Sequence, residues 1–158
     1  MKTMISIIVT LVLLTFVSLG QKVNPNKVPD GVKTAFLNEY PKAMQANWRM
    51  QKADFQVLFT LDRVQHAAKY DKNGQWIDKE TRISVTELPN EVQETIAKKF
   101  KGYKAYEGEK IETPAKGMLY NVGLAKEKKF LEVHFSANGD VLDKVTKKMK
   151  SEWGKDND

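Results

Sequence analysis

The sequence predicts an α+β fold that is a tandem repeat of two α-β4 units, each a helix followed by a four-stranded antiparallel sheet. The first observation is an internal repetition: NGQWIDKET at residues 73–81 returns as NGDVLDKVT at residues 138–146. The second is a pair of similar segments, VPDGV at 28–32 and LPNEV at 88–92, which lie sixty residues apart. Similarity at a regular spacing is typical of repeated supersecondary units.

Each unit is predicted to open with an amphipathic helix. Pro29 and Pro89 suit the first turn of a helix, where no backbone N–H is needed. Apolar residues then recur at helical spacing: Val32, Ala35, Phe36 and Tyr40 in the first helix, and Val92, Ile96, Phe100 and Tyr103 in the second. Pro41 and Gly102 are predicted to end the two helices.

The remainder of each unit is predicted to be strands, because apolar and polar residues alternate there. In the first unit the strands are expected around residues 47–51, 55–60 and 64–70 and from residue 75 onward. Their counterparts are expected around residues 104–112, 120–124 and 129–135 and from residue 140 onward. Asn73-Gly74 and Asn138-Gly139 predict tight hairpin turns before the last strand of each unit, since Asn-Gly between alternating runs is a strong hairpin signal.

Residues 1–20 have the features of a secretory signal peptide. Lys2 precedes an apolar run from Met4 to Leu19, and small residues at Ser18 and Gly20 predict cleavage before Gln21. The alternative is an uncleaved membrane anchor, for which this run is short. The predicted division is a signal peptide at 1–20, a linker at 21–27, a first unit at 28–87, a second unit at 88–150 and a flexible tail at 151–158.

Charge and cysteine content limit the range of possible functions. Residues 21–158 contain 25 Lys and Arg against 20 Asp and Glu, a net charge of +5 that is interleaved along the chain. Interleaved charge is typical of solvated faces, which argues against a nucleic-acid partner and leaves open a weak attraction to anionic surfaces. The chain has no cysteine, so disulfides, thiol nucleophiles and thiolate metal sites are excluded.

No catalytic or metal-binding pattern is evident. His66 is predicted to point toward the helix and His134 to face solvent on the opposite side of its strand, so a shared metal site is not expected. Acidic residues near the hairpins, Asp71, Asp78, Asp140 and Asp143, are explained by turn chemistry rather than by a calcium loop. Nucleophile and phosphate-binding motifs are missing. The sequence therefore predicts a protein that is not an enzyme, with no catalytic residues, no cofactor and no metal.

The order of these motifs resembles the PepSY-like, β-lactamase-inhibitor-like family of exported proteins from Bacteroides-group bacteria. The residues that carry the resemblance are Val28-Pro29, Val32-Lys33, Ala35-Phe36, Tyr40-Pro41, Trp48, Tyr70-Asp71, Asn73-Gly74, Trp76, Leu88-Pro89 and Val92. The resemblance covers residues 28–149 and implies a fold like that of β-lactamase inhibitory protein and a periplasmic location. The inhibitor is braced by disulfides and this chain has no cysteine, so β-lactamase inhibition is not carried over.

The expected function is a non-enzymatic periplasmic module that binds another envelope protein, with inhibition of a hydrolase as an extension. The alternatives are a binder of small ligands or cations in the envelope, and a secreted rather than periplasmic location. No nucleic acid and no membrane-spanning segment after cleavage are expected. Because Trp and Arg dominate binding hot spots, the candidate partner-binding residues are Trp48, Arg49, Arg63, Lys69, Lys79 and Arg82. For Trp48, packing between helix and sheet is the other interpretation.

Overall fold

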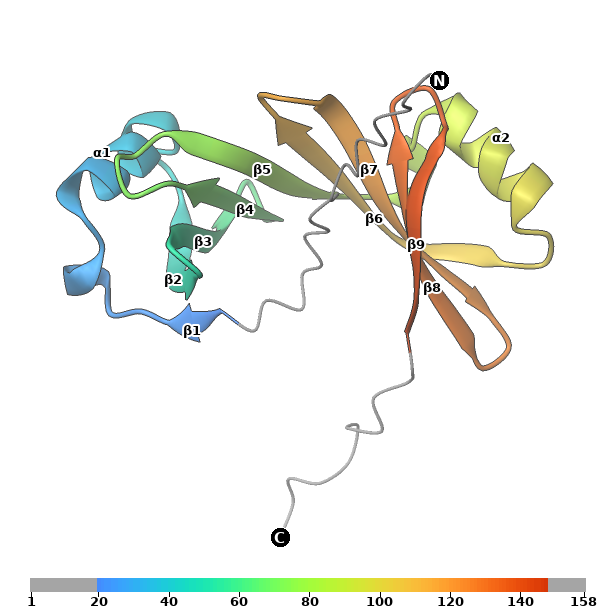
Figure 1. Ribbon diagram of the computed structural model, residues 1–158, viewed down its shortest axis with the longest axis horizontal. Coiled ribbons are helices and arrows are strands. Elements are labelled where there is room, and N and C mark those ends of the chain that lie inside the picture. The colour runs from blue at the N-terminus through green and yellow to red at the C-terminus, as the bar shows by residue number, and fades with distance from the viewer. Residues whose placement is uncertain (1–19, 148–158) are drawn as a thin grey trace, which may run out of the picture.

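The computed structural model describes residues 20–147, which form one nine-stranded antiparallel sheet and two α-helices (Figure 1). The strands lie side by side in chain order, from β1 to β9. Their bounds are β1 Gln21–Lys22, β2 Met44–Gln51, β3 Asp54–Leu61, β4 Val64–Tyr70, β5 Trp76–Ile83, β6 Lys104–Thr113, β7 Gly117–Lys126, β8 Lys129–Ser136 and β9 Val141–Lys147. The helices are α1 Asp30–Glu39 and α2 Asn90–Lys99, and each follows a short 3-10 turn, η1 Pro25–Lys27 or η2 Val85–Glu87.

The predicted fold class, α+β with a tandem repeat of two α-β4 units, is wrong. β5 pairs with β6 in register from Lys79↔Glu112 to Ile83↔Gly108, so the strands form a single sheet and the chain is mostly β. The physical reason is that two separate four-stranded sheets would leave β5 and β6 as unpaired edges. Joining them satisfies the backbone N–H and C=O groups of both strands.

Both helices cover the same face of this sheet. Beneath α1, Phe36 packs against Trp48 and Phe59 in the first core cluster. Beneath α2, Val92 lies in a second cluster with Val122 and other buried strand residues. Fully burying one aliphatic side chain contributes about 1.5–3 kcal/mol, so each helix is held mainly by a few such residues.

The two Asn-Gly hairpin turns are confirmed, and each one packs against the first turn of a helix. Gly74 and Gly139 have positive φ angles of 83° and 81°. A Cβ atom on Gly74 would lie 2.7 Å from the Gly31 carbonyl oxygen, and one on Gly139 would lie 2.4 Å from the Glu91 carbonyl oxygen. Glycine is therefore required twice over at these positions, by backbone conformation and by close packing.

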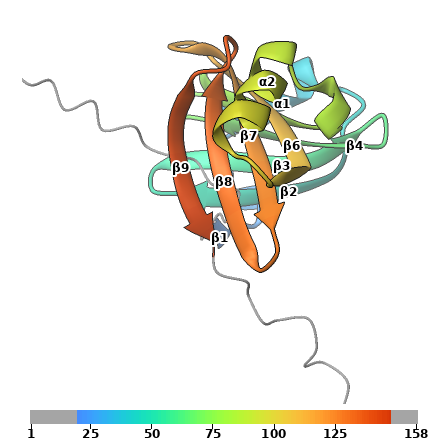
Figure 2. The same ribbon diagram turned by 90° about the vertical axis from the view of Figure 1, so that its right-hand side faces the viewer.

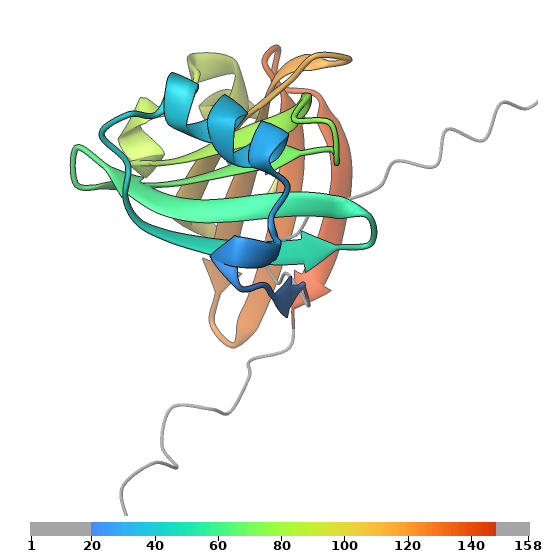
Figure 3. The same ribbon diagram turned by 90° about the vertical axis from the view of Figure 1, so that its left-hand side faces the viewer.

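The sheet twists strongly from one end to the other. Figures 2 and 3 show that the strands β2 to β4 run across the direction of β7 to β9. In Figure 1 the two ends of the sheet bend toward the side opposite the helices, so the face without helices is concave. Residues 1–19 and 148–158 lie outside the described residues; they include most of the predicted signal peptide and the whole of the predicted flexible tail. Among residues 20–147, no helix is long and apolar enough to span a membrane.

Candidate functional site

The helix-free face of the sheet carries two similar rows of polar side chains. Gln56, Lys69 and Asp78 are cross-strand neighbours on β3, β4 and β5. The other row has the same order of an amide, a base and an aspartate: Asn121, His134 and Asp143 on β7, β8 and β9. Side chains alternate between the faces of a strand, and the neighbours of these residues lie in the two cores, so both rows point away from the helices.

The first row contains a buried ion pair. Lys69 Nζ lies 3.2 Å from Asp78 Oδ2, and Asp78 is only 1% exposed. Burial raises the pKa of Asp78, and the neighbouring Lys69 ammonium lowers it in part. Removing one partner of such a pair leaves an uncompensated buried charge, which is far more destabilising than losing both. The pair therefore constrains β4 against β5.

Glu80 lies between the two rows, in the middle of the sheet. It is 2% exposed, and burial, together with the nearby carboxylates of Asp78 and Glu109, raises its pKa to about 9. Its Oε2 atom makes no hydrogen bond within residues 20–147. Glu80 is therefore a protonated, neutral acid at physiological pH, because ionising it there would leave a carboxylate without water around it.

Glu109 on β6 is the second acid with a strongly shifted pKa. Burial raises the pKa of Glu109 to about 7, while a hydrogen bond from Asn121 opposes the shift. The Asn121 side-chain amide donates to Glu109 Oε2 at 2.9 Å and to Glu132 Oε1 at 2.8 Å. One amide thus bridges two carboxyl groups on neighbouring strands, and Glu109 titrates near neutral pH.

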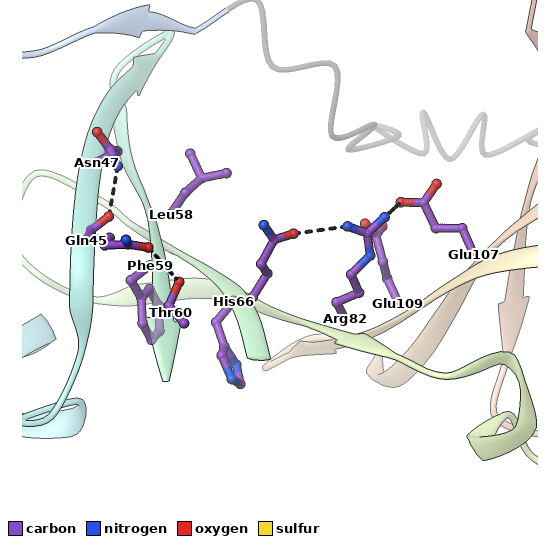
Figure 4. A pocket seen from close by; sticks show the side chains of 10 residues that line it. Gln45, Asn47, Leu58, Phe59, Thr60, His66, Arg82, Glu107 and Glu109 are labelled. Atoms are coloured by element: carbon purple, nitrogen blue, oxygen red, sulfur yellow. Dashed lines mark hydrogen bonds and ion pairs between the residues drawn. The ribbon is translucent and has the colours of Figure 1, made fainter. Parts of the chain in front are cut away.

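A cavity of about 270 Å³ opens on this face beside Glu109 (Figure 4). Arg82 extends along it from β5, and its guanidinium donates to Gln65 Oε1 at 3.0 Å and to Glu107 Oε1 at 2.5 Å. The other lining residues come from β2, β3, β4 and β6 and include the amides Gln45 and Asn47. Ligand pockets usually measure about 300–1,000 Å³, so this cavity lies just below that range.

Three of the predicted binding residues lie away from this face. Trp48 is buried in the core, with its ring centroid 5.5 Å from that of Phe36 in a T-shaped arrangement. Lys79 points to the helix side, where it pairs with Glu39 and lies 4.2 Å above the Trp76 ring. Arg63 is exposed in the turn between β3 and β4.

The other three predicted residues, Arg49, Lys69 and Arg82, are on the helix-free face. Arg49 is the cross-strand neighbour of Gln56, and Arg82 borders the cavity, where its side chain is 52% exposed. Lys69 is on the same face but is buried against Asp78. The structure therefore does not bring the six candidates together, and their role in binding stays a prediction.

Predictions for individual polar residues had mixed outcomes. His66 points toward the helix side as predicted, stacked on Phe59 with ring centroids 5.3 Å apart. Asp71 makes the expected turn bonds, since its Oδ1 accepts from the Asn73 and Gln75 backbone N–H groups. Three predictions are wrong: His134 is buried rather than facing solvent, and Asp78 and Asp143 lie within β5 and β9 rather than in turns.

The buried acids Glu80 and Glu109 and the bridging Asn121 were not identified from the sequence. One signal was present: Gln56, Lys69 and Asp78 precede Asn121, His134 and Asp143 by sixty-five residues each, which is the spacing of the repeated hairpins.

Within residues 20–147, no group of three His, Cys, Asp or Glu side chains could hold a metal ion. Buried structural networks shift pKa values as active sites do, and Glu80 is only 2% exposed.

Comparison with known proteins places this geometry in a family. The family described as "Putative beta-lactamase-inhibitor-like, PepSY-like" matches residues 53–143 of the chain. A DUF2874 family protein from Bacteroides uniformis ATCC 8492 has a similar structure, with a TM-score of 0.69 and 17% identity over 75% of this chain and 88% of that one. No curated protein matches the chain.

Two other solved structures agree. A protein from Bacteroides eggerthii DSM 20697, described as a "putative periplasmic" protein, has a TM-score of 0.70 and 20% identity over 75% of this chain and 88% of that one. A BLIP-like protein from Bacteroides fragilis NCTC 9343 has a TM-score of 0.66 and 19% identity over 78% of this chain and 90% of that one. At these identities the likeness shows a shared fold alone. The family match covers residues 53–143, more than half of this chain, so the chain belongs to the PepSY-like, β-lactamase-inhibitor-like family.

Proposed function

We propose that the protein is a non-enzymatic periplasmic binding module, and that its concave, helix-free sheet face takes up a protein partner. The observation that carries the proposal is the cavity beside Arg82, which opens on a face that neither helix covers. Its rim offers an arginine fork, a carboxylate on Glu107 and exposed amides on Gln45 and Asn47. Arginine is among the residues that contribute most to protein interfaces.

The chemistry of the face supports binding rather than catalysis. An acid–base catalyst must reach its substrate within hydrogen-bonding distance. Glu80 is enclosed within the sheet, and the raised pKa of Glu109 comes first from burial, with the neighbouring Glu107 and Glu132 carboxylates adding to it. These acids therefore shape and rigidify the face.

Inhibition of a hydrolase is the specific form of this proposal. A concave sheet can enclose a protruding loop of an enzyme, and Arg82 with Glu107 would meet charged side chains at the rim of that loop. The fold shared with a protein described as BLIP-like supports this form. The rigid, ion-paired sheet also favours it, because a preorganised surface loses little entropy on binding.

A small ligand of the envelope is the second candidate, favoured by the cavity itself. Its lining is mixed, with the apolar Leu58 beside polar groups. A ligand that binds only the native state raises the melting temperature by mass action. A panel of envelope solutes that leaves the melting temperature unchanged would remove this candidate.

Site-specific photo-cross-linking in intact cells tests the proposal. A photoreactive amino acid at Asn47 or Gln65 places the probe on exposed residues that line the cavity. Matched probes at Leu37 on α1 and Gln93 on α2 are also at exposed positions and lie on the helix side. We expect one discrete cross-linked protein from the cavity positions and none from the helix positions. Adducts from the helix positions alone would refute the proposal.

A further inference from the structure

Seven lysines gather at one end of the sheet, away from the cavity. Strand pairing places the start of β6, the end of β7 and the start of β8 at the same end, through Lys104↔Ala125 and Lys126↔Lys129. The last turn of α2 and the α2–β6 turn join them on the right-hand side of Figure 1. We call this set the basic end: Lys98, Lys99, Lys101, Lys104, Lys126, Lys128 and Lys129.

The basic end holds most of the net charge of the chain. Residues 94–104 and 126–129 contain seven lysines and two glutamates, an excess of five positive charges, whereas the whole chain has a net charge of +6. One of the glutamates, Glu94, is already paired with Lys98 at 2.8 Å. Charge that looks interleaved along the sequence is therefore concentrated in space.

Contacts between turns hold the basic end together. Lys126 Nζ donates to the Lys101 carbonyl oxygen at 3.3 Å. A Cβ atom on Gly102 would lie 2.9 Å from the same Nζ atom. The α2–β6 turn and the β7–β8 turn are thus in direct contact, although they are twenty-five residues apart in sequence. Two of the lysines, Lys98 and Lys99, also compensate the negative end of the α2 dipole, but this explains none of the other five.

Aromatic side chains flank these lysines. Tyr103 lies beside Lys126, whose Nζ is 5.9 Å from the ring centroid. Tyr106, on the helix-free side, is 53% exposed and packs edge to face on Phe130, with ring centroids 6.2 Å apart. Tyrosine next to lysine is the combination that anchors proteins at the boundary between headgroups and acyl chains.

We propose that the basic end docks the protein on an anionic phospholipid surface. All seven cations are lysines, with no arginine among them. Lysine acts as a mobile point charge, whereas specific recognition of a phosphorylated or acidic motif favours the planar fork of arginine. A diffuse surface of phosphate headgroups therefore fits this end better than a structured acidic partner.

Co-sedimentation with lipid vesicles tests this docking. The purified exported protein is mixed with vesicles of phosphatidylglycerol and phosphatidylethanolamine, or of phosphatidylcholine alone, over a series of salt concentrations. The triple variant K101Q/K104Q/K128Q removes three exposed lysines of the basic end. The variant K52Q/K72Q/K116Q removes the same charge from exposed turns elsewhere and serves as the matched control.

We expect binding to the anionic vesicles only, weakening as salt rises. K101Q/K104Q/K128Q should lower the partition coefficient about 100-fold, since each lysine near an anionic surface contributes about fivefold, while the control variant stays within about threefold of the wild type. Equal losses in both variants would show that net charge alone acts, and would overturn the proposal. No binding to anionic vesicles, or binding to soluble polyglutamate alone, would overturn it as well, the latter in favour of an acidic protein partner.

Discussion

Replacing Glu80 by glutamine is expected to stabilise the protein at neutral and alkaline pH. Glutamine has nearly the shape of the protonated acid but has no proton to lose. The pKa of Glu80 is about 9 in the folded protein and 4.5 as an unperturbed side chain. Between these two values the unfolded chain releases a proton that the native protein retains, so the wild type loses stability as pH rises.

The size of the effect follows from this difference. One pKa unit corresponds to about 1.36 kcal/mol, so at about pH 7 the protonated Glu80 lowers the free energy of unfolding by about 3 kcal/mol. At about pH 5 the same calculation gives a loss of unfolding free energy below about 1 kcal/mol. Above about pH 7 Glu109 is ionised in both states, so Glu80 alone continues the decline, at about 1.4 kcal/mol per pH unit up to about pH 9.

Urea unfolding of wild type and Glu80→Gln at about pH 5, 7 and 8.5 measures these differences by linear extrapolation. Glu127→Gln, at an exposed position in the β7–β8 turn, is the matched control and should follow the wild type at each pH. The stability gain of Glu80→Gln should grow with pH. A gain that is independent of pH, or a variant less stable than the wild type at about pH 8.5, would show that Glu80 is ionised in the native sheet.

The remaining predictions concern the ion pair, a hairpin and the cavity. Lys69→Met should lower the free energy of unfolding by about 3 kcal/mol. Adding Asp78→Asn should restore most of that stability. A double variant as unstable as Lys69→Met would contradict the claim that Lys69 and Asp78 neutralise each other as a buried pair. Gly139→Ala should lower the free energy of unfolding by about 3 kcal/mol, because both the positive φ angle and the nearby Glu91 carbonyl oppose a Cβ atom. Gly117 also has a positive φ angle but lies in open space, so Gly117→Ala should lower it by about 1 kcal/mol. Equal losses of stability in thermal unfolding would show that the contact with Glu91 contributes nothing. Arg82→Ala should change stability by less than about 1 kcal/mol, since its pair with Glu107 is exposed; a larger loss by urea unfolding would make Arg82 structural.

The helices and hairpin turns could be predicted because their signals are local. Pro29, Pro89 and the two Asn-Gly pairs act within a few residues of themselves, and the structure has a helix or a turn at each. The joining of β5 to β6 is different, since it pairs Ile83 with Gly108 across the whole of α2. Alternation of residues describes one strand at a time and does not say whether its edge is paired, which is why the predicted fold class failed.

The site was harder to predict than the fold. Charged residues are seldom fully buried, so Asp78 was assigned to a turn and Glu80 was not noticed, although both lie deep in the sheet. The direction of Trp48 and Lys79 depends on which face the helices cover, and the mixed composition of both faces left this open. Arg82 was identified for its residue type; the structure adds that it is the cation beside the cavity.

The central claim is that the helix-free face binds a protein partner, and the most direct measurement combines cross-linking with Arg82→Ala. A photoreactive residue at Asn47 is activated in cells that carry either the wild-type arginine or alanine at position 82. The claim predicts one discrete adduct with wild-type Arg82 and its loss in Arg82→Ala at equal protein levels. The same adduct at full yield in Arg82→Ala, or adducts only from the probe at Leu37 on α1, would contradict it.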